Sequence, residues 1–167
     1  MRPGRTGSHA EAMERPVVPL AIVGVIGGLV LLWRSSAPAG PVLVASPTLT
    51  PGVVNPEVRQ ETIGETICKR GWTRTVRPPS SYTAELKLRQ MREYGVGGDP
   101  SGYQEDHLIS LELGGHPTDP RNLWPEPQPR AGEVDRIENE LSGKVCSGEL
   151  TLAEAQHRES ELKHRSG

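Results

Sequence analysis

The chain has 167 residues and a formal net charge of −2, which is close to balanced. This length favours one folded domain, and without a strongly basic field the chain is not expected to bind a nucleic-acid duplex tightly. Glycine and proline are abundant (19 and 16 residues) and Phe is absent, so we expect a small core with long connections.

The first part of the chain predicts a membrane segment. Residues 1–15 are polar and are expected to be disordered, and an uncharged apolar run long enough to span a membrane follows within residues 16–34. Arginines precede this run, which favours a cytoplasmic N-terminus and an exported remainder. An uncleaved signal anchor is favoured over a signal peptide cut after Ala37-Pro38-Ala39. We therefore expect a single-pass cell-membrane protein with an extracytoplasmic domain, or a secreted one if the segment is cleaved.

A linker rich in Pro, Ser and Ala is expected at residues 35–54, and the folded domain at residues 55–167. The chain has two cysteines, Cys68 and Cys146. Because an extracytoplasmic compartment permits disulfides, we expect these two to form one that ties the start of the domain to its end. The alternative is a pair of unpaired small core residues.

The domain is expected to be α+β, with helices around a small two-stranded unit. In the last helix, Thr151 and Glu154 predict a capping box, and the charged end with His157 and His164 is expected to be solvated. The Pro-rich stretch 126–130 is expected not to be helical, because proline lacks the backbone donor. The expected elements in chain order are a helix from Asn55, a short edge strand at 71–79, a helix from Ser81 to Gly95, an extended run at 103–113, a short strand at 122–125, and helices from Ala131 and Thr151.

One stretch brings together residue types that carry out chemistry. Asp106 and His107 open the extended run, the Gly114-Gly115 turn follows, and Asn122 begins the second strand before a helix. The pattern "EDHLISLELGG…PRNLW" resembles the HNH, or ββα-metal, nuclease motif over residues 103–142. With the flanking stretches "TICKRGWTRTVRPP…YTAELKLRQMREYG" before it and "CSGELTLAEAQ" after it, the chain resembles small exported bacterial HNH-like proteins over residues 55–156. The resemblance implies an HNH-like ββα-metal core with flanking helices, preceded here by the transmembrane helix and the linker.

The resemblance also implies roles for single residues. Asp106 matches the first metal ligand, His107 the general base that activates water, and Asn122 the residue that braces the loop and orients the histidine. The third ligand departs from the family pattern, since no His or Asn occurs in the first turn after the second strand. An apolar stripe runs through the following helix at Val134, Ile137, Leu141 and Val145.

Helical geometry places Glu138 near the middle of this stripe and Asp135 on its flank. We rank Asp135 first, Glu138 second and Asn139 third as the missing ligand. A carboxylate among apolar neighbours needs a cation or an arginine as its partner, because burial of a lone charge is costly. With carboxylate ligands, a divalent metal ion is expected, with Mg²⁺ or Mn²⁺ favoured and Zn²⁺ as an alternative.

Neighbouring side chains on a strand point to opposite faces, so Asp106 and His107 can share a metal only if the strand bends or bulges there. Arg121, Arg130 and His116 lie in the loops nearby and are candidates for binding substrate.

Together these features predict a metal-dependent HNH-like endonuclease that acts outside the cytoplasmic membrane on weakly bound DNA or RNA, with His107 as general base. The alternative is a non-catalytic extracytoplasmic binding module that keeps the ββα scaffold. A third hypothesis is a hydrolase of a cell-envelope phosphodiester. The N-terminal helix is expected to contact the membrane, and no protein partner is predicted.

Overall fold

The structure is a computed structural model that describes residues 43–166. These residues belong to the second of two compact units of the chain, Pro38–Gly167. The predicted tail at 1–15 and the predicted span at 16–34 fall outside the described residues. Between residues 43 and 166, no helix is long and apolar enough to cross a membrane.

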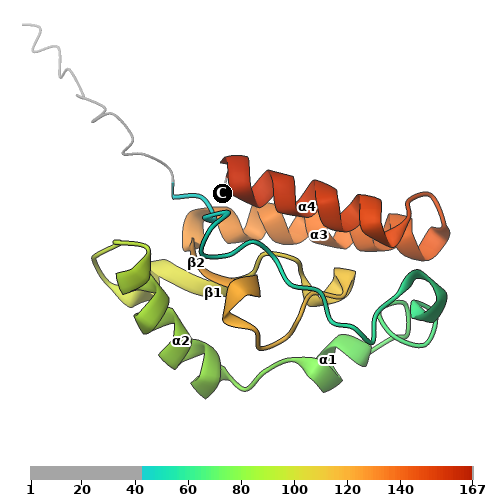
Figure 1. The fold of residues 1–167 in the computed structure, drawn as a ribbon, viewed down its shortest axis with the longest axis horizontal. Helices are drawn as coiled ribbons and strands as arrows, with labels where there is room; N and C mark the ends of the chain where they lie inside the picture. The colour runs from blue at the N-terminus through green and yellow to red at the C-terminus, as the bar shows by residue number, and fades with distance from the viewer. Residues whose placement is uncertain (1–42, 167) are drawn as a thin grey trace, which may run out of the picture. The chain divides into compact units, whose positions relative to one another are not determined.

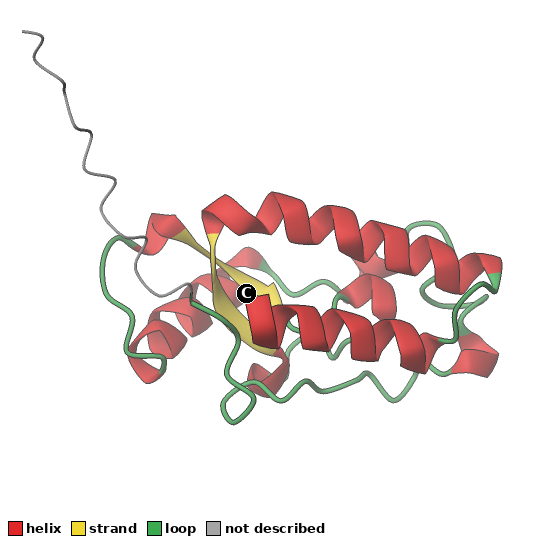
Figure 2. Cartoon of the chain, turned by 90° about the horizontal axis from the view of Figure 1, so that it is seen from above, coloured by secondary structure: helices red, strands yellow, loops and turns green. Residues whose placement is uncertain are grey.

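The domain is α+β, as predicted: a two-stranded antiparallel sheet is surrounded by helices (Figure 1). The last two helices, α3 (Gln128–Ser147) and α4 (Leu152–Ser166), run side by side (Figure 2), and Figure 1 shows both of them on one side of the sheet. The elements are α1 Trp72–Val76, α2 Ser80–Glu93, β1 Tyr103–His107, β2 Leu123–Pro127, α3 Gln128–Ser147 and α4 Leu152–Ser166.

The two strands pair without interruption from Tyr103↔Pro127 to His107↔Leu123. The expected extended run is shorter than predicted, because the strand ends at His107 and the chain turns through a 3-10 helix at Leu111–Leu113. Gly114 ends this turn with a φ of 76°, a left-handed conformation that favours glycine. No bulge interrupts the ladder, so Asp106 and His107 keep the opposite directions of neighbouring strand residues.

Three local predictions are wrong. The expected edge strand at 71–79 is the helix α1, in which Trp72 packs against the main core cluster. The helix expected from Asn55 is replaced by turns and a 3-10 helix at Gln60–Thr62. The Pro-rich stretch is divided between β2 and the start of α3, where Pro129 in the first turn leaves no intrahelical bond unmade.

The main core lies where α3 and α4 meet the turns that precede α1 and follow β1. A second, smaller cluster joins Trp124 of β2 to Leu108 and Ala45. The main cluster contains the buried residues Val58, Ile67, Ile109, Leu113, Leu141, Val145, Leu152 and Ala155.

The last part of the predicted linker, residues 43–54, belongs to the packed domain. Ala45 and Thr50 are fully buried, and the Ala45 amide donates to the carbonyl of Lys163 in α4. The Gly52 amide donates to the Arg121 carbonyl, and the Val53 carbonyl accepts from the His116 amide. The folded region therefore begins before Asn55, since these backbone groups find their partners in the domain.

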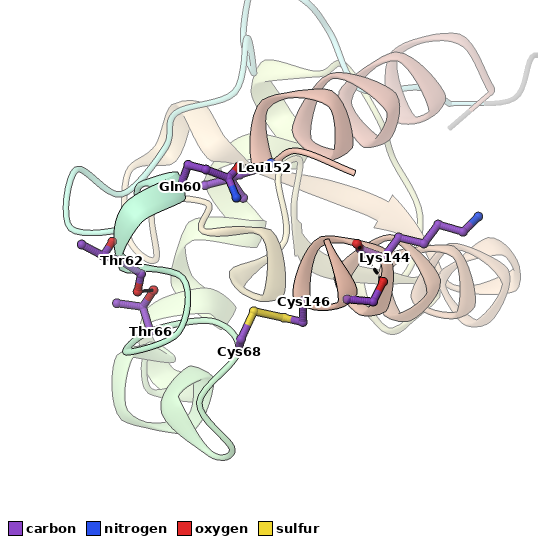
Figure 3. The surroundings of a disulfide bond; sticks show 8 residues. Gln60, Thr62, Thr66, Cys68, Lys144, Cys146 and Leu152 are labelled. Carbon is purple, nitrogen blue, oxygen red and sulfur yellow. Dashed lines mark hydrogen bonds between the residues drawn. A yellow bond between two sulfur atoms is a disulfide. The ribbon is translucent and has the colours of Figure 1, made fainter. Parts of the chain in front are cut away.

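The predicted disulfide between Cys68 and Cys146 is confirmed (Figure 3). It joins residues 78 positions apart, with a Cα–Cα distance of 5.6 Å. Nearby, the Gln60 side chain accepts a hydrogen bond from the Leu152 amide at the start of α4. These two links attach the segment before α1 to the helical pair α3 and α4.

Candidate functional site

Asn122, at the end of the loop before β2, connects three segments through its fully buried side chain. Its Oδ1 accepts from the amides of Ile109 (3.0 Å) and Val53 (3.4 Å). Its Nδ2 donates to the carbonyls of Ile109 (3.0 Å) and His116 (3.1 Å). Each of these hydrogen bonds satisfies a backbone group that has no partner in the β1–β2 ladder, so the Asn122 side chain can hold the loop in place.

His107, the last residue of β1, is 6 % exposed. Its Nε2 lies 3.0 Å from the carbonyl of Pro117. A carbonyl only accepts, so this contact assigns the proton to Nε2 and leaves Nδ1 with a free lone pair. Burial lowers the pKa of His107 below its ordinary 6.5. The imidazole is therefore neutral near pH 7, in the form that can take a proton from water.

Asp106 points to a different partner, the ammonium group of Lys163 in α4. The Lys163 Nζ lies 2.8 Å from Asp106 Oδ2, 2.6 Å from Glu138 Oε1 and 3.5 Å from Glu159 Oε1. It also donates to the backbone carbonyl of His107. Lys163 and Glu159 are fully buried, so this cluster is a desolvated ion network beneath the end of β1.

The ionisable groups of this cluster differ in the direction of their pKa shifts. Burial alone would raise the pKa of Asp106, but the Lys163 ammonium and the His107 amide lower it below the ordinary value. Burial raises the pKa of Glu138, and that of Glu159 well above its ordinary value, with Lys163 offsetting only part of the effect. The pKa of Lys163 is raised by the three carboxylates in spite of its burial. Asp106 is thus the ionised partner of the ammonium, and the two glutamates retain protons more readily.

The predicted divalent metal ion is contradicted by this arrangement. Among the described residues, no group of three or more His, Cys, Asp or Glu side chains could hold a metal ion. Asp106 and Glu138 do converge, but on Lys163, which supplies the cation that their burial requires. His107 turns to the Pro117 loop, because the unbulged strand sends neighbouring side chains to opposite faces.

A cavity of about 650 Å³ opens over the end of β1. It is bordered by the α1–α2 junction, β1, the turn at 110–112 and one face of α3. Arg77 lies on its wall, with an exposed side chain. The residues with polar side chains that line it are Arg77, Ser80, Thr83, Gln104, Glu105, Asp106, His107, Ser110, Glu112, Asp135, Glu138 and Asn139.

The three candidate residues for the helix position differ in their surroundings. Glu138 is buried, as the apolar stripe predicts, and it contacts Asp106 through Lys163. Asp135 and Asn139 are exposed on the cavity wall, and the Asn139 side chain donates to the Asp135 carbonyl. Of the three, Glu138, which was ranked second as a metal ligand, is the one that converges with Asp106, and the partner that the two share is Lys163.

The three predicted substrate-binding residues, Arg121, Arg130 and His116, are not among the residues that line this cavity. Arg121 forms a two-point contact with Asp119, at 3.0 and 2.7 Å. His116 accepts from the Asp119 amide through Nδ1 (2.9 Å), which shapes the loop. Arg130 lies in the first turn of α3 and is partly buried.

Sequence reasoning missed Lys163 and Glu159, and it expected the charged end of the last helix to be solvated. A signal was present: Leu152, Ala155, Glu159 and Lys163 are spaced by three and four residues, which puts them on one helix face. Two other acids, the partly buried Glu105 and the buried Glu126, were also missed. Burial, with the nearby Asp106 charge, raises the pKa of each to about 8.

Comparisons with known proteins leave the family open. The chain matches no protein-family model, no curated protein and no solved structure.

Proposed function

We propose that this chain is a hydrolase of phosphodiester bonds, with nucleic acid as its substrate and His107 as the general base. The observation that carries the proposal is the state of the His107 ring. Its Nε2 is bonded to the Pro117 carbonyl, its pKa is lowered, and it lines a polar cavity. A neutral, oriented imidazole in a cavity is the arrangement that general-base catalysis needs.

The reaction follows from these groups. Nδ1 of His107 takes a proton from a water molecule, whose oxygen attacks the phosphorus. The bond from phosphorus to the leaving oxygen breaks, and this oxygen takes a proton from solvent. Arg77 is the one cationic side chain that lines the described cavity, and its guanidinium suits a non-bridging phosphate oxygen.

Nucleic acid is proposed as the substrate because the spacing of Asp106, His107, the glycine turn and Asn122 resembles the HNH nuclease motif. The near-neutral chain charge and the acidic cavity wall favour weak, transient binding. The disulfide supports the proposal that the domain acts outside the cytoplasm, since disulfides persist in oxidising compartments.

The test is digestion of plasmid DNA, single-stranded DNA and RNA by the purified full-length chain. His107→Ala is expected to lower the rate roughly 100-fold or more, the range that general-base catalysis contributes. His157→Ala is the matched control, because His157 is exposed on α4 and its ion-pair partner is the surface residue Glu161. If both proteins are folded and cleave at equal rates, His107 is not the general base.

A second candidate, a non-catalytic binding module, is favoured by one observation. The ammonium of Lys163 lies between Asp106 and Glu138, the two carboxylates that were candidates for holding a metal ion in this chain. Binding of an oligonucleotide that is never cleaved, weakened by Arg77→Ala and unchanged by His107→Ala, would select this function instead.

A further inference from the structure

Lys163 is a completely enclosed charge of the site. Its side chain is 0 % exposed, although it lies three residues before the last described residue of α4. An ammonium group has three N–H donors. They are used on Asp106 Oδ2 (2.8 Å), Glu138 Oε1 (2.6 Å) and the His107 carbonyl. No donor remains for a substrate.

These contacts connect three elements at one point. Lys163 belongs to α4, Glu138 to α3, and Asp106 with His107 to the end of β1. Two of the three hydrogen bonds therefore fall on the general base or on the residue before it. Buried charges that are fully hydrogen-bonded hold their neighbours in one geometry, while a broken network leaves a costly unpaired charge.

Glu159 approaches the Lys163 ammonium at 3.5 Å. It lies one turn before Lys163 on α4, and both of its carboxylate oxygens accept from the Ser110 amide at 3.0 Å. Ser110 follows β1 by three residues, so the chain on both sides of Leu108 is attached to α4. The strand end that carries His107 is thus held by the last helix.

We infer that Lys163 is a positioning residue for His107, and that the last helix is part of the site through it. The role in catalysis rests on the proposed function. Lys163 acts through Asp106 and the His107 backbone, and it does not touch the substrate.

The first experiment separates kcat from KM. Lys163→Met in the full-length chain is expected to lower kcat roughly 10- to 100-fold, the loss caused by a misplaced catalytic group, with KM changed by less than about twofold. Lys144→Met is the control, because Lys144 also lies on a long helix and makes a carboxylate pair, with Glu140, at the surface. The control is expected to keep both constants.

A second variant separates positioning from stability. Lys163→Met/Asp106→Asn removes the ionised carboxylate together with its cation, so that no unpaired charge stays buried. Its melting temperature is expected to recover part of the loss seen in Lys163→Met, and its kcat is expected to stay low. Recovery of kcat in step with the melting temperature would assign Lys163 a purely structural role and overturn the inference.

A third readout needs no activity. Nitrogen NMR of the His107 ring is expected to show the Nε2–H tautomer alone in the wild type and in Lys144→Met. In the folded double variant a mixture of tautomers is expected, because the Pro117 contact loosens. A single tautomer in that variant overturns the inference. Absence of cleavage by the wild type overturns the proposed function, and the ring spectrum then still decides whether Lys163 positions His107.

Discussion

Asn122→Ala is expected to be the most destabilising single truncation of a side chain in the loop before β2. The side chain makes three hydrogen bonds at 3.0, 3.0 and 3.1 Å, with a longer fourth at 3.4 Å. Each is worth about 1 kcal/mol, and the buried backbone groups left behind lose their partners. We expect a loss of about 3–4 kcal/mol in the free energy of unfolding, a large share of the roughly 5–15 kcal/mol that holds a typical domain.

The assay is urea unfolding followed by tryptophan fluorescence, since Trp124 lies in the buried cluster next to the loop. Asn122→Asp keeps the acceptor but places an oxygen against the carbonyls of Ile109 and His116, so it is expected to destabilise at least as much as alanine. Asn139→Ala is the control, because its side chain is exposed and makes one hydrogen bond, to Asp135. A loss below about 1 kcal/mol for Asn122→Ala would refute the bracing role.

Three further predictions concern the rest of the domain. Removal of the disulfide in Cys68→Ala/Cys146→Ala, whose loop spans 78 residues, is expected to cost about 4 kcal/mol in chemical unfolding; an unchanged midpoint would contradict this. Folding raises the pKa of Glu105 from 4.5 to about 8. The stability that Glu105 contributes is therefore fully present below its pKa in the unfolded chain, and it is lost as the pH rises through its pKa in the folded domain. When unfolding is measured at a pH above about 8, Glu105→Gln is therefore expected to raise the urea midpoint, and at about pH 4 it is expected to leave the midpoint nearly unchanged. Equal shifts of the midpoint at both pH values would argue against a neutral Glu105 in the folded protein. Gly115→Ala is expected to prevent folding, because a Cβ there collides with the Ile109 carbonyl and lies 2.7 Å from Asn122 Nδ2, whereas Gly132→Ala on open helix surface is expected to stabilise by up to about 1 kcal/mol in thermal melts.

The parts of the fold that follow from local pattern could be predicted from the sequence. The stripe of Val134, Leu141 and Val145 is buried, and Glu138 is buried within it. The capping box is present, since Thr151 Oγ1 accepts from the Glu154 amide and Glu154 Oε2 accepts from the Thr151 amide. These features depend on residues within one or two helical turns of each other.

Tertiary packing decided the rest. The stretch at 72–76 has strand-forming residues but becomes helical, because within residues 43–166 the only sheet is the β1–β2 pair and Trp72 packs against the main core cluster. The metal prediction failed for a related reason. The cation that satisfies Asp106 comes from Lys163, 57 residues away, and no local pattern around Asp106 announces it.

The most direct test of the central claim is the rate of oligonucleotide cleavage by the full-length chain in excess EDTA. If catalysis depends on His107 held in place by Lys163 and on no divalent ion, the cleavage rate is expected to be the same with and without the chelator. His107→Ala is expected to abolish most of this cleavage. Cleavage that appears only when a divalent ion is added, or that persists in His107→Ala, would contradict the account.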